Sequence, residues 1–163
     1  MAGGGISNKG GTMKKIITLL LFCAVSFGAS AELGWLYKDS IAILTSGEEY
    51  LGNDFDNPTT LTIMLESGDG MEIALIGLQS DFAFYKFRES QQYIVTDFNG
   101  ERTKWEIKNV EIDGNFLKYI YVVDATKFID KLCECDFFAI TLPLAIYGTT
   151  TFYFNTNGYP LDW

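Results

Sequence analysis

Two closely spaced cysteines in the C-terminal half are the residues whose type and spacing most directly suggest chemistry. Cys133 and Cys135 are separated by a single residue. A relaxed disulfide between them is difficult, because it requires two Cα atoms within about 7 Å and side chains that converge. The pair is therefore interpreted either as two small, partly buried thiols or as one strained disulfide. A C-x-C redox site is the sharper hypothesis.

The sequence contains no histidine, and this removes the most common routes to catalysis at neutral pH. Ser-His-Asp and Cys-His nucleophiles and histidine-ligated zinc sites all need this side chain. No G-x-S-x-G motif, phosphate-binding glycine loop or dinucleotide fingerprint occurs. The acidic loop 50–58 does not have the glycine and glutamate spacing of a calcium loop starting at Asp54. We therefore predict a protein that is not an enzyme and that binds neither a metal ion nor a cofactor.

Carboxylate pairs are a catalytic device that needs no histidine. Glu48 or Glu49 could act with Asp54 or Asp56 in glycoside hydrolysis. No sequence spacing defines such a pair, so solvated loop acids are the simpler interpretation. A carboxylate-dependent cell-wall hydrolase stays as an alternative to the prediction of a binding protein.

Phenylalanine, tyrosine and tryptophan make up 15% of the chain, and most of these residues are expected to fill a hydrophobic core. Four of them fall near turns or near the C-terminus, where a ring is harder to bury completely. The residues predicted in this way to contact a binding partner are Tyr147, Tyr153, Tyr159 and Trp163.

Residues 13–31 have the three parts of a secretory signal peptide. Lys14 and Lys15 supply the positive charge, Ile16 to Val25 supplies the apolar segment, and Ala29 to Ala31 supplies small residues for cleavage. The apolar segment is shorter than the roughly 20 residues that a transmembrane helix needs. We therefore expect a bacterial protein that is periplasmic or secreted, with no transmembrane segment after cleavage.

The expected cleavage divides the chain into three parts. Residues 1–12 are glycine-rich and are interpreted as an upstream start or an expression remnant. Residues 13–31 are the expected signal peptide, and residues 32–163 are the expected single β-rich domain. A domain of this length is large enough for one hydrophobic core.

The chain is acidic, with 12 basic and 21 acidic residues and a net charge of −9. The first 31 residues contain three of the basic residues and none of the acidic ones, so the remainder carries a net charge of −12. Such a surface repels nucleic acids and anionic membranes. The expected partner is another envelope or secreted protein, and the charge favours a basic one.

Short apolar runs between closely spaced turn signals dominate the chain after residue 31, which is typical of antiparallel β structure. The turn signals include Ser67 to Gly70 and the Asn99-Gly100 pair. One or two strands are predicted over residues 32–45, and single strands are predicted over 59–66, 71–78, 93–96, 102–107, 117–123, 137–144 and 150–154.

One segment, residues 125–132, has a helical pattern. Asp124 is expected to cap this helix, and Phe128, Ile129 and Leu132 fall at the spacing of one buried face. The predicted fold class is therefore mainly β. We expect an antiparallel β-sandwich or a curled sheet, with one short helix near the C-terminal strands.

Several short motifs together resemble a group of small exported bacterial proteins. The motifs are Thr60 to Ile63, Gly70 to Gly77, Phe98 to Gly100, Phe128 to Leu132, Gly148 to Phe154 and Gly158 to Trp163. Their order is similar to that of the periplasmic accessory proteins associated with type VI secretion, the VasI/TagO-like family. Members of that family often carry a cysteine pair around the middle hairpin, whereas Phe82 to Val95 contains none here. The resemblance implies a periplasmic accessory protein and offers no catalytic residues.

These observations combine into one functional prediction with two alternatives. We predict an exported, non-enzymatic envelope protein that binds another protein, either as a type VI secretion accessory or as an immunity-like inhibitor. The alternatives are the carboxylate-dependent hydrolase and a redox or small-ligand module built on Cys133 and Cys135.

Overall fold

A computed structural model describes residues 35–38, 41–52, 58–68, 70–80, 83, 85–87, 92–109 and 119–157. The chain divides into two units, Met1–Glu32 and Leu33–Trp163, and the described residues all belong to the second unit. The expected signal peptide and the expected contact residues Tyr159 and Trp163 lie outside the described residues.

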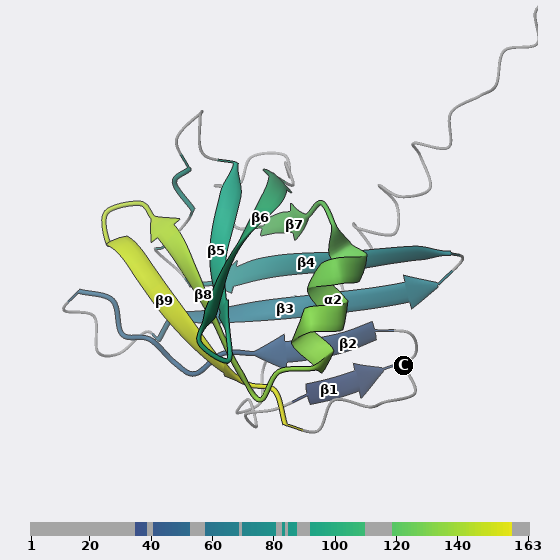
Figure 1. Cartoon of the computed structure of the whole chain (residues 1–163). Helices are drawn as coiled ribbons and strands as arrows, with labels where there is room; N and C mark the ends of the chain where they lie inside the picture. The colour runs from purple at the N-terminus through teal and green to yellow at the C-terminus, as the bar shows by residue number, and fades with distance from the viewer. Residues whose placement is uncertain are drawn as a thin grey trace, which may run out of the picture. The chain divides into compact units, whose positions relative to one another are not determined.

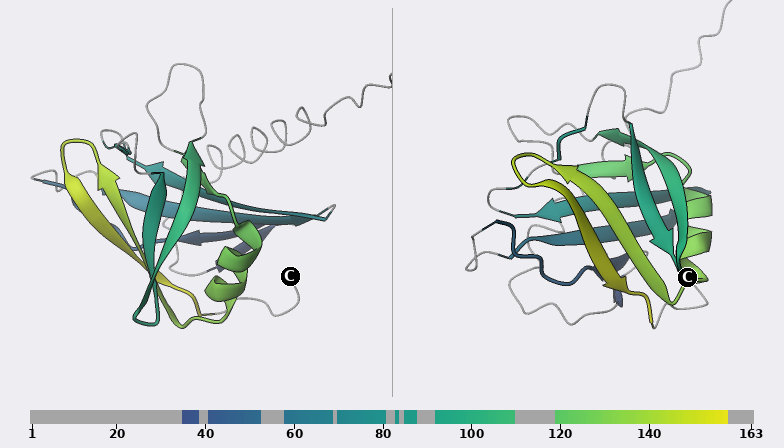
Figure 2. Two further views of the ribbon diagram at one scale, coloured as in Figure 1. Left: turned by 45° about the horizontal axis from the view of Figure 1, so that its top comes forward. Right: turned by 60° about the vertical axis from the view of Figure 1, so that its left-hand side comes forward.

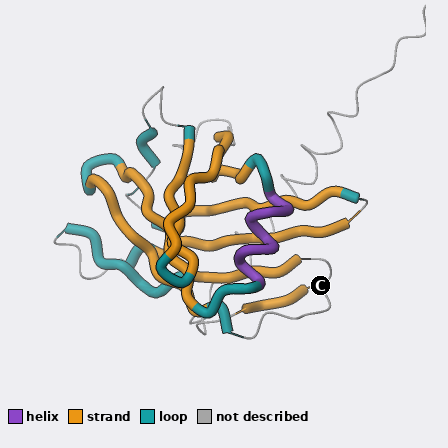
Figure 3. The backbone as a smooth tube through the Cα atoms, in the orientation of Figure 1, coloured by secondary structure: helices purple, strands orange, loops and turns teal. Residues whose placement is uncertain are grey.

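The described residues form nine β-strands and one α-helix (Figures 1 and 3). In chain order the elements are β1 (Trp35–Lys38), β2 (Ile41–Thr45), β3 (Thr60–Gly68), β4 (Met71–Gln79), β5 (Tyr93–Phe98), β6 (Glu101–Asn109), β7 (Tyr119–Val122), α2 (Ala125–Cys133), β8 (Phe137–Leu144) and β9 (Gly148–Asn155). All paired strands are antiparallel and belong to one sheet, in the order β1-β2-β3-β4-β7-β6-β5-β8-β9. The prediction of a mainly β, curled sheet with one short helix is confirmed.

The hairpin between β5 and β6 turns where the sequence predicts it. Asn99 and Gly100 both have positive φ angles, 51° and 90°, as a tight Asn-Gly hairpin turn requires. The Asp97 carboxylate accepts a hydrogen bond from the Gly100 amide at 2.6 Å. The Asn99 side chain accepts hydrogen bonds from the amides of Asp136 and Phe137 at 3.1 and 2.9 Å. The turn therefore also fixes the start of β8.

The sheet curls so that its two halves face each other. Figures 1 and 2 show β5, β6, β8 and β9 crossing in front of β2, β3 and β4, with α2 beside them over β3 and β4. β6 pairs with β5 on one side and with β7 on the other, so the two halves are continuous. Apolar side chains from both halves and from α2 fill the space between them and form one core.

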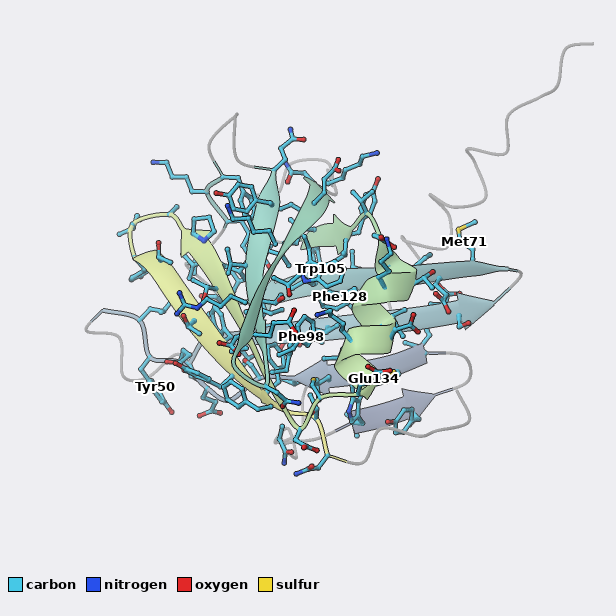
Figure 4. The ribbon with its side chains drawn as sticks, viewed as in Figure 1. Tyr50, Met71, Phe98, Trp105, Phe128 and Glu134 are labelled. Atoms are coloured by element: carbon cyan, nitrogen blue, oxygen red, sulfur yellow. The ribbon has the colours of Figure 1, made fainter. Side chains whose placement is uncertain are left out.

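An aromatic cluster at the centre of this core joins the helix to the curled sheet (Figure 4). The Phe128 ring of α2 lies 5.3 Å from the Trp105 ring of β6 and 6.0 Å from the Phe98 ring of β5, measured between centroids. Phe98 in turn contacts Phe138 of β8 at 4.8 Å. The indole N–H of Trp105 donates a hydrogen bond to Thr96 Oγ1 at 2.8 Å, so its one polar group is satisfied despite burial.

The helix buries the face that its sequence predicts. Phe128, Ile129 and Leu132 are all buried. Asp124 occupies the N-cap position, as expected, but its side chain makes no capping hydrogen bond. Its carboxylate instead accepts a hydrogen bond from the Lys127 ammonium at 2.8 Å. That hydrogen bond lowers the pKa of Asp124.

The central parts of β3 and β4 are buried on both faces. On the face away from α2, Met64 and Leu75 are directly paired and fully buried. Tyr119 of β7 lies over Gly77 on this same face, where a Cβ atom would come within 2.9 Å of the tyrosine ring. The sequences of these central strands are therefore nearly continuous apolar runs, without a regular alternation of apolar and polar residues.

We predict that Phe128→Ala lowers the free energy of unfolding by about 3–5 kcal/mol, because it removes the ring at the centre of the aromatic cluster and leaves a cavity. Urea unfolding followed by circular dichroism measures this change. The matched control is Phe137→Ala, since Phe137 is 42% exposed and its loss should cost less than about 1 kcal/mol. Equal losses for the two variants would show that the cluster does not hold the sheet together.

Candidate binding surface along β9

Three exposed aromatic side chains lie on or beside the last two strands: Phe137 of β8, Tyr153 of β9 and Tyr50 of the segment 46–52. Together with the half-buried Tyr147 in the turn before β9, we call them the aromatic strip. The rings of Phe137 and Tyr153 lie 6.0 Å apart. Phe137, Tyr153 and Tyr50 are 42%, 54% and 48% exposed. Exposed large rings that lie together on a surface are typical of a binding site.

The pairing of β8 with β9 places two of these rings on the outer face of the sheet. Phe138 and Phe154 are directly paired and point into the core. Because side chains alternate along a strand, their neighbours Phe137 and Tyr153 must point outward. Ala139 is directly opposite Tyr153 and is only 3% exposed.

Residues 46–52 bring Tyr50 alongside β9. The amide of Gly47 donates a hydrogen bond to the Tyr153 carbonyl at 3.1 Å. At the other end of this segment, a Cβ atom on Gly52 would lie 3.3 Å from the ring of Tyr147. The segment therefore runs antiparallel to β9, with Tyr50 between these two contacts.

A carboxylate lies within the aromatic strip. The Tyr50 hydroxyl donates a hydrogen bond to Glu48 Oε2 at 2.9 Å, and this bond raises the pKa of Tyr50. Both side chains are exposed. A positively charged group is attracted both to the face of an exposed aromatic ring and to a carboxylate held next to that ring.

Ile146 is the most exposed large apolar residue recorded in the described part of the chain. It lies in the turn between β8 and β9, next to Tyr147, and is 88% exposed. Its φ angle is 73°, a left-handed conformation that costs a residue other than glycine about 1–2 kcal/mol. A β-branched apolar side chain is unfavourable here because it is exposed to solvent and because its backbone conformation is strained. Backbone strain of this kind is common at functional positions.

The structure brings two of the four predicted contact residues into this surface. Tyr153 is exposed, whereas Tyr147 is half-buried and packs against the core. Tyr159 and Trp163 are outside the described residues and stay predictions. Sequence reasoning missed Phe137, Tyr50 and Ile146. The turn signal around Gly148 could have indicated Ile146, but nothing local indicates that Tyr50 lies beside β9.

The two cysteines are both thiols, and they lie where α2 leads into β8. Cys133 is half-buried and Cys135 is buried. The Cys135 thiol donates a hydrogen bond to the Leu132 carbonyl at 3.3 Å. Burial raises the pKa of Cys135 to about 11, which disfavours the reactive thiolate. The redox alternative stays a hypothesis.

The carboxylates of the hydrolase alternative are only partly described. Glu48 is exposed and bound to Tyr50, and Glu49 is half-buried beside it. Asp54 and Asp56 lie outside the described residues. Within the described ranges, no three His, Cys, Asp or Glu side chains come together as a metal site. No helix in that part of the chain is long and apolar enough to span a membrane.

Comparisons with protein-family models, with curated proteins and with solved structures gave no match to this chain.

We predict that iodoacetamide alkylates Cys135 roughly 100-fold more slowly in the folded protein than in urea at pH 8. A pKa of about 11 leaves roughly 100-fold less thiolate than the ordinary value near 9 does. The rate in the folded protein should rise with pH up to that pKa, and peptide mass spectrometry follows both cysteines separately. Equal rates with and without urea would contradict the burial of this thiol.

Proposed function

We propose that this chain is an exported, non-enzymatic protein-binding domain that binds an extended segment of another envelope or secreted protein along the aromatic strip. The observation that carries the proposal is the exposure of Phe137, Tyr153 and Tyr50 on or beside β9, together with the strained and exposed Ile146 in the turn before it. Aromatic side chains dominate the binding energy of many interfaces because they bury a large area at a small entropic cost.

The composition and charge of the surface suggest what the partner segment contains. Glu48 lies within the aromatic strip, and Asp136 is an exposed neighbour of Phe137. The chain as a whole carries a net charge of −9. Lysine or arginine side chains in the partner could therefore lie against the rings while their charges face carboxylates.

The wider role follows the family that the sequence resembles. A periplasmic accessory protein associated with type VI secretion, or an inhibitor of an envelope enzyme, would need a binding surface and no catalytic site. The absence of histidine from the sequence supports this class over an enzyme.

Site-specific photo-crosslinking in cells tests the proposal. A photoreactive phenylalanine analogue at Tyr153 should give an adduct with one protein, identified by mass spectrometry. The control position is Met71, which is 44% exposed at the far end of the sheet (Figure 4) and should give no such adduct. Identical adducts at both positions, or release of soluble sugars from peptidoglycan by the purified protein, would contradict the proposal.

We predict that Tyr153→Ala weakens binding of the crosslinked partner at least about tenfold, the usual effect of removing a central aromatic contact. Isothermal titration calorimetry measures the dissociation constant. Met71→Ala should leave it unchanged, and urea unfolding should show that both variants are folded. An unchanged constant for Tyr153→Ala would remove this residue from the binding surface.

We predict opposite effects of Ile146→Gly on stability and on binding. Glycine adopts the left-handed conformation without steric cost, so the free energy of unfolding should rise by about 0.5–1 kcal/mol. Loss of the exposed side chain should weaken partner binding. Denaturation and calorimetry on the same preparation measure both effects. A variant that is more stable and binds equally well would show that Ile146 has no role in recognition.

A further inference from the structure

Two hydrogen bonds join the first strand, the last strand and the end of α2 at one place, which we call the latch. The indole N–H of Trp35 in β1 donates to the carbonyl of Thr156 at 3.1 Å. The Thr156 hydroxyl, just after β9, donates to the carbonyl of Cys135. Thr156 is buried. In the described part of the chain β1 and β9 form no ladder, so the latch is a principal link between the two ends of the sheet.

Both cysteines lie close to the latch, since Cys135 supplies one of its carbonyls and Cys133 is two residues away. Cys135 is buried, whereas Cys133 is half-buried and lies near Tyr37 of β1. Burial and, to a smaller extent, Cys133 raise the pKa of Tyr37 to about 12. The Tyr37 ring stacks on Trp35 with centroids 6.2 Å apart. A group added to Cys133 would therefore press on β1.

The backbone between the cysteines keeps their side chains apart. Glu134 has helical angles, φ −91° and ψ −6°, and side chains two positions apart in such a turn point to nearly opposite sides. A bond between the two sulfur atoms thus requires the last turn of α2 to unwind. That movement would take the Cys135 carbonyl away from Thr156.

We propose that Cys133 and Cys135 are a thiol modification site, at which exchange with a low-molecular-weight disulfide opens the latch and releases β1. The Cys133 thiolate attacks one sulfur atom of the external disulfide, forming a mixed disulfide and expelling one thiol. The Cys135 thiolate then attacks the Cys133 sulfur atom and expels the second thiol. Two cysteine thiols are oxidised, and one external disulfide is reduced to two thiols.

The order of these steps follows from exposure. Cys133 is the less buried residue, whereas Cys135 is 7% exposed and its thiol is bonded to the Leu132 carbonyl. The mixed disulfide should therefore accumulate before the ring formed by a Cys133–Cys135 disulfide closes. A strained product is readily reduced, so the modification should be reversible by dithiothreitol. This inference does not depend on the proposed binding function.

Oxidised glutathione tests the proposal on the full chain carrying Cys23→Ser, which removes the third thiol. The intact mass should first gain one glutathione and then fall to the starting mass less two hydrogen atoms. Amide hydrogen exchange in β1 should rise about tenfold or more after ring closure, while exchange in β3 stays unchanged. Dithiothreitol should reverse both changes.

Two threonine variants distinguish the opening of the latch from a general destabilisation of the fold. Thr156→Val removes the hydroxyl that holds Cys135 and should close the ring several-fold faster. Thr149→Val, an exposed threonine on β9, should leave the rate unchanged. Cys133→Ser should abolish both the mixed disulfide and the Cys133–Cys135 disulfide. Because it replaces only the half-buried thiol, folding is retained. A folded chain that forms no disulfide, or one that forms it without a change in β1 exchange, would overturn the proposal.

Discussion

The insertion of Phe128 between the crossing strands is the interaction on which the rest of the structure depends. A single curled sheet encloses a core only if something fills the space between its two halves, and Phe128 of α2 is fully buried there. It contacts Trp105 and Phe98, and through them the cluster reaches Phe138 at the start of β8. The helix is short and would be only marginally stable alone. The helix and the sheet therefore stabilise each other.

The core also fixes the outer surface, because alternation along a strand couples the two faces. Phe138 and Phe154 face the core as a directly paired row, so Phe137 and Tyr153 must face solvent. A shift of one residue in the pairing of β8 and β9 would turn every one of these side chains to the other face. The Asn99 hydrogen bonds to the amides of Asp136 and Phe137 hold the start of β8 in place. The geometry of the candidate surface is thus set by the same contacts that stabilise the fold.

Local features of this fold could be predicted from the sequence, and long-range ones could not. The Asn99-Gly100 turn and the buried face of α2 follow from residue type and spacing. The order of the sheet, in which β7 pairs with β4 and β6, depends on contacts between distant strands that no local pattern specifies. The same holds for the candidate surface, since Tyr153 was predicted from its place near a turn but Tyr50 joins it only through the Gly47 hydrogen bond. Asp124 is the N-cap residue, as its type and position predict, but its carboxylate is bonded to the Lys127 ammonium.

The protected edge of β9 determines how this surface can recognise a partner. A terminal strand usually offers its backbone groups to another chain. Here the Tyr153 carbonyl is already bonded to Gly47, and residues 46–52 lie along that edge. A partner strand could not extend the sheet past Tyr153 without displacing this segment. The proposed recognition would therefore use side chains on the outer face, with specificity from the spacing of the rings and from Glu48 rather than from main-chain pairing at this edge. A surface that binds through side chains discriminates between partners by their sequence.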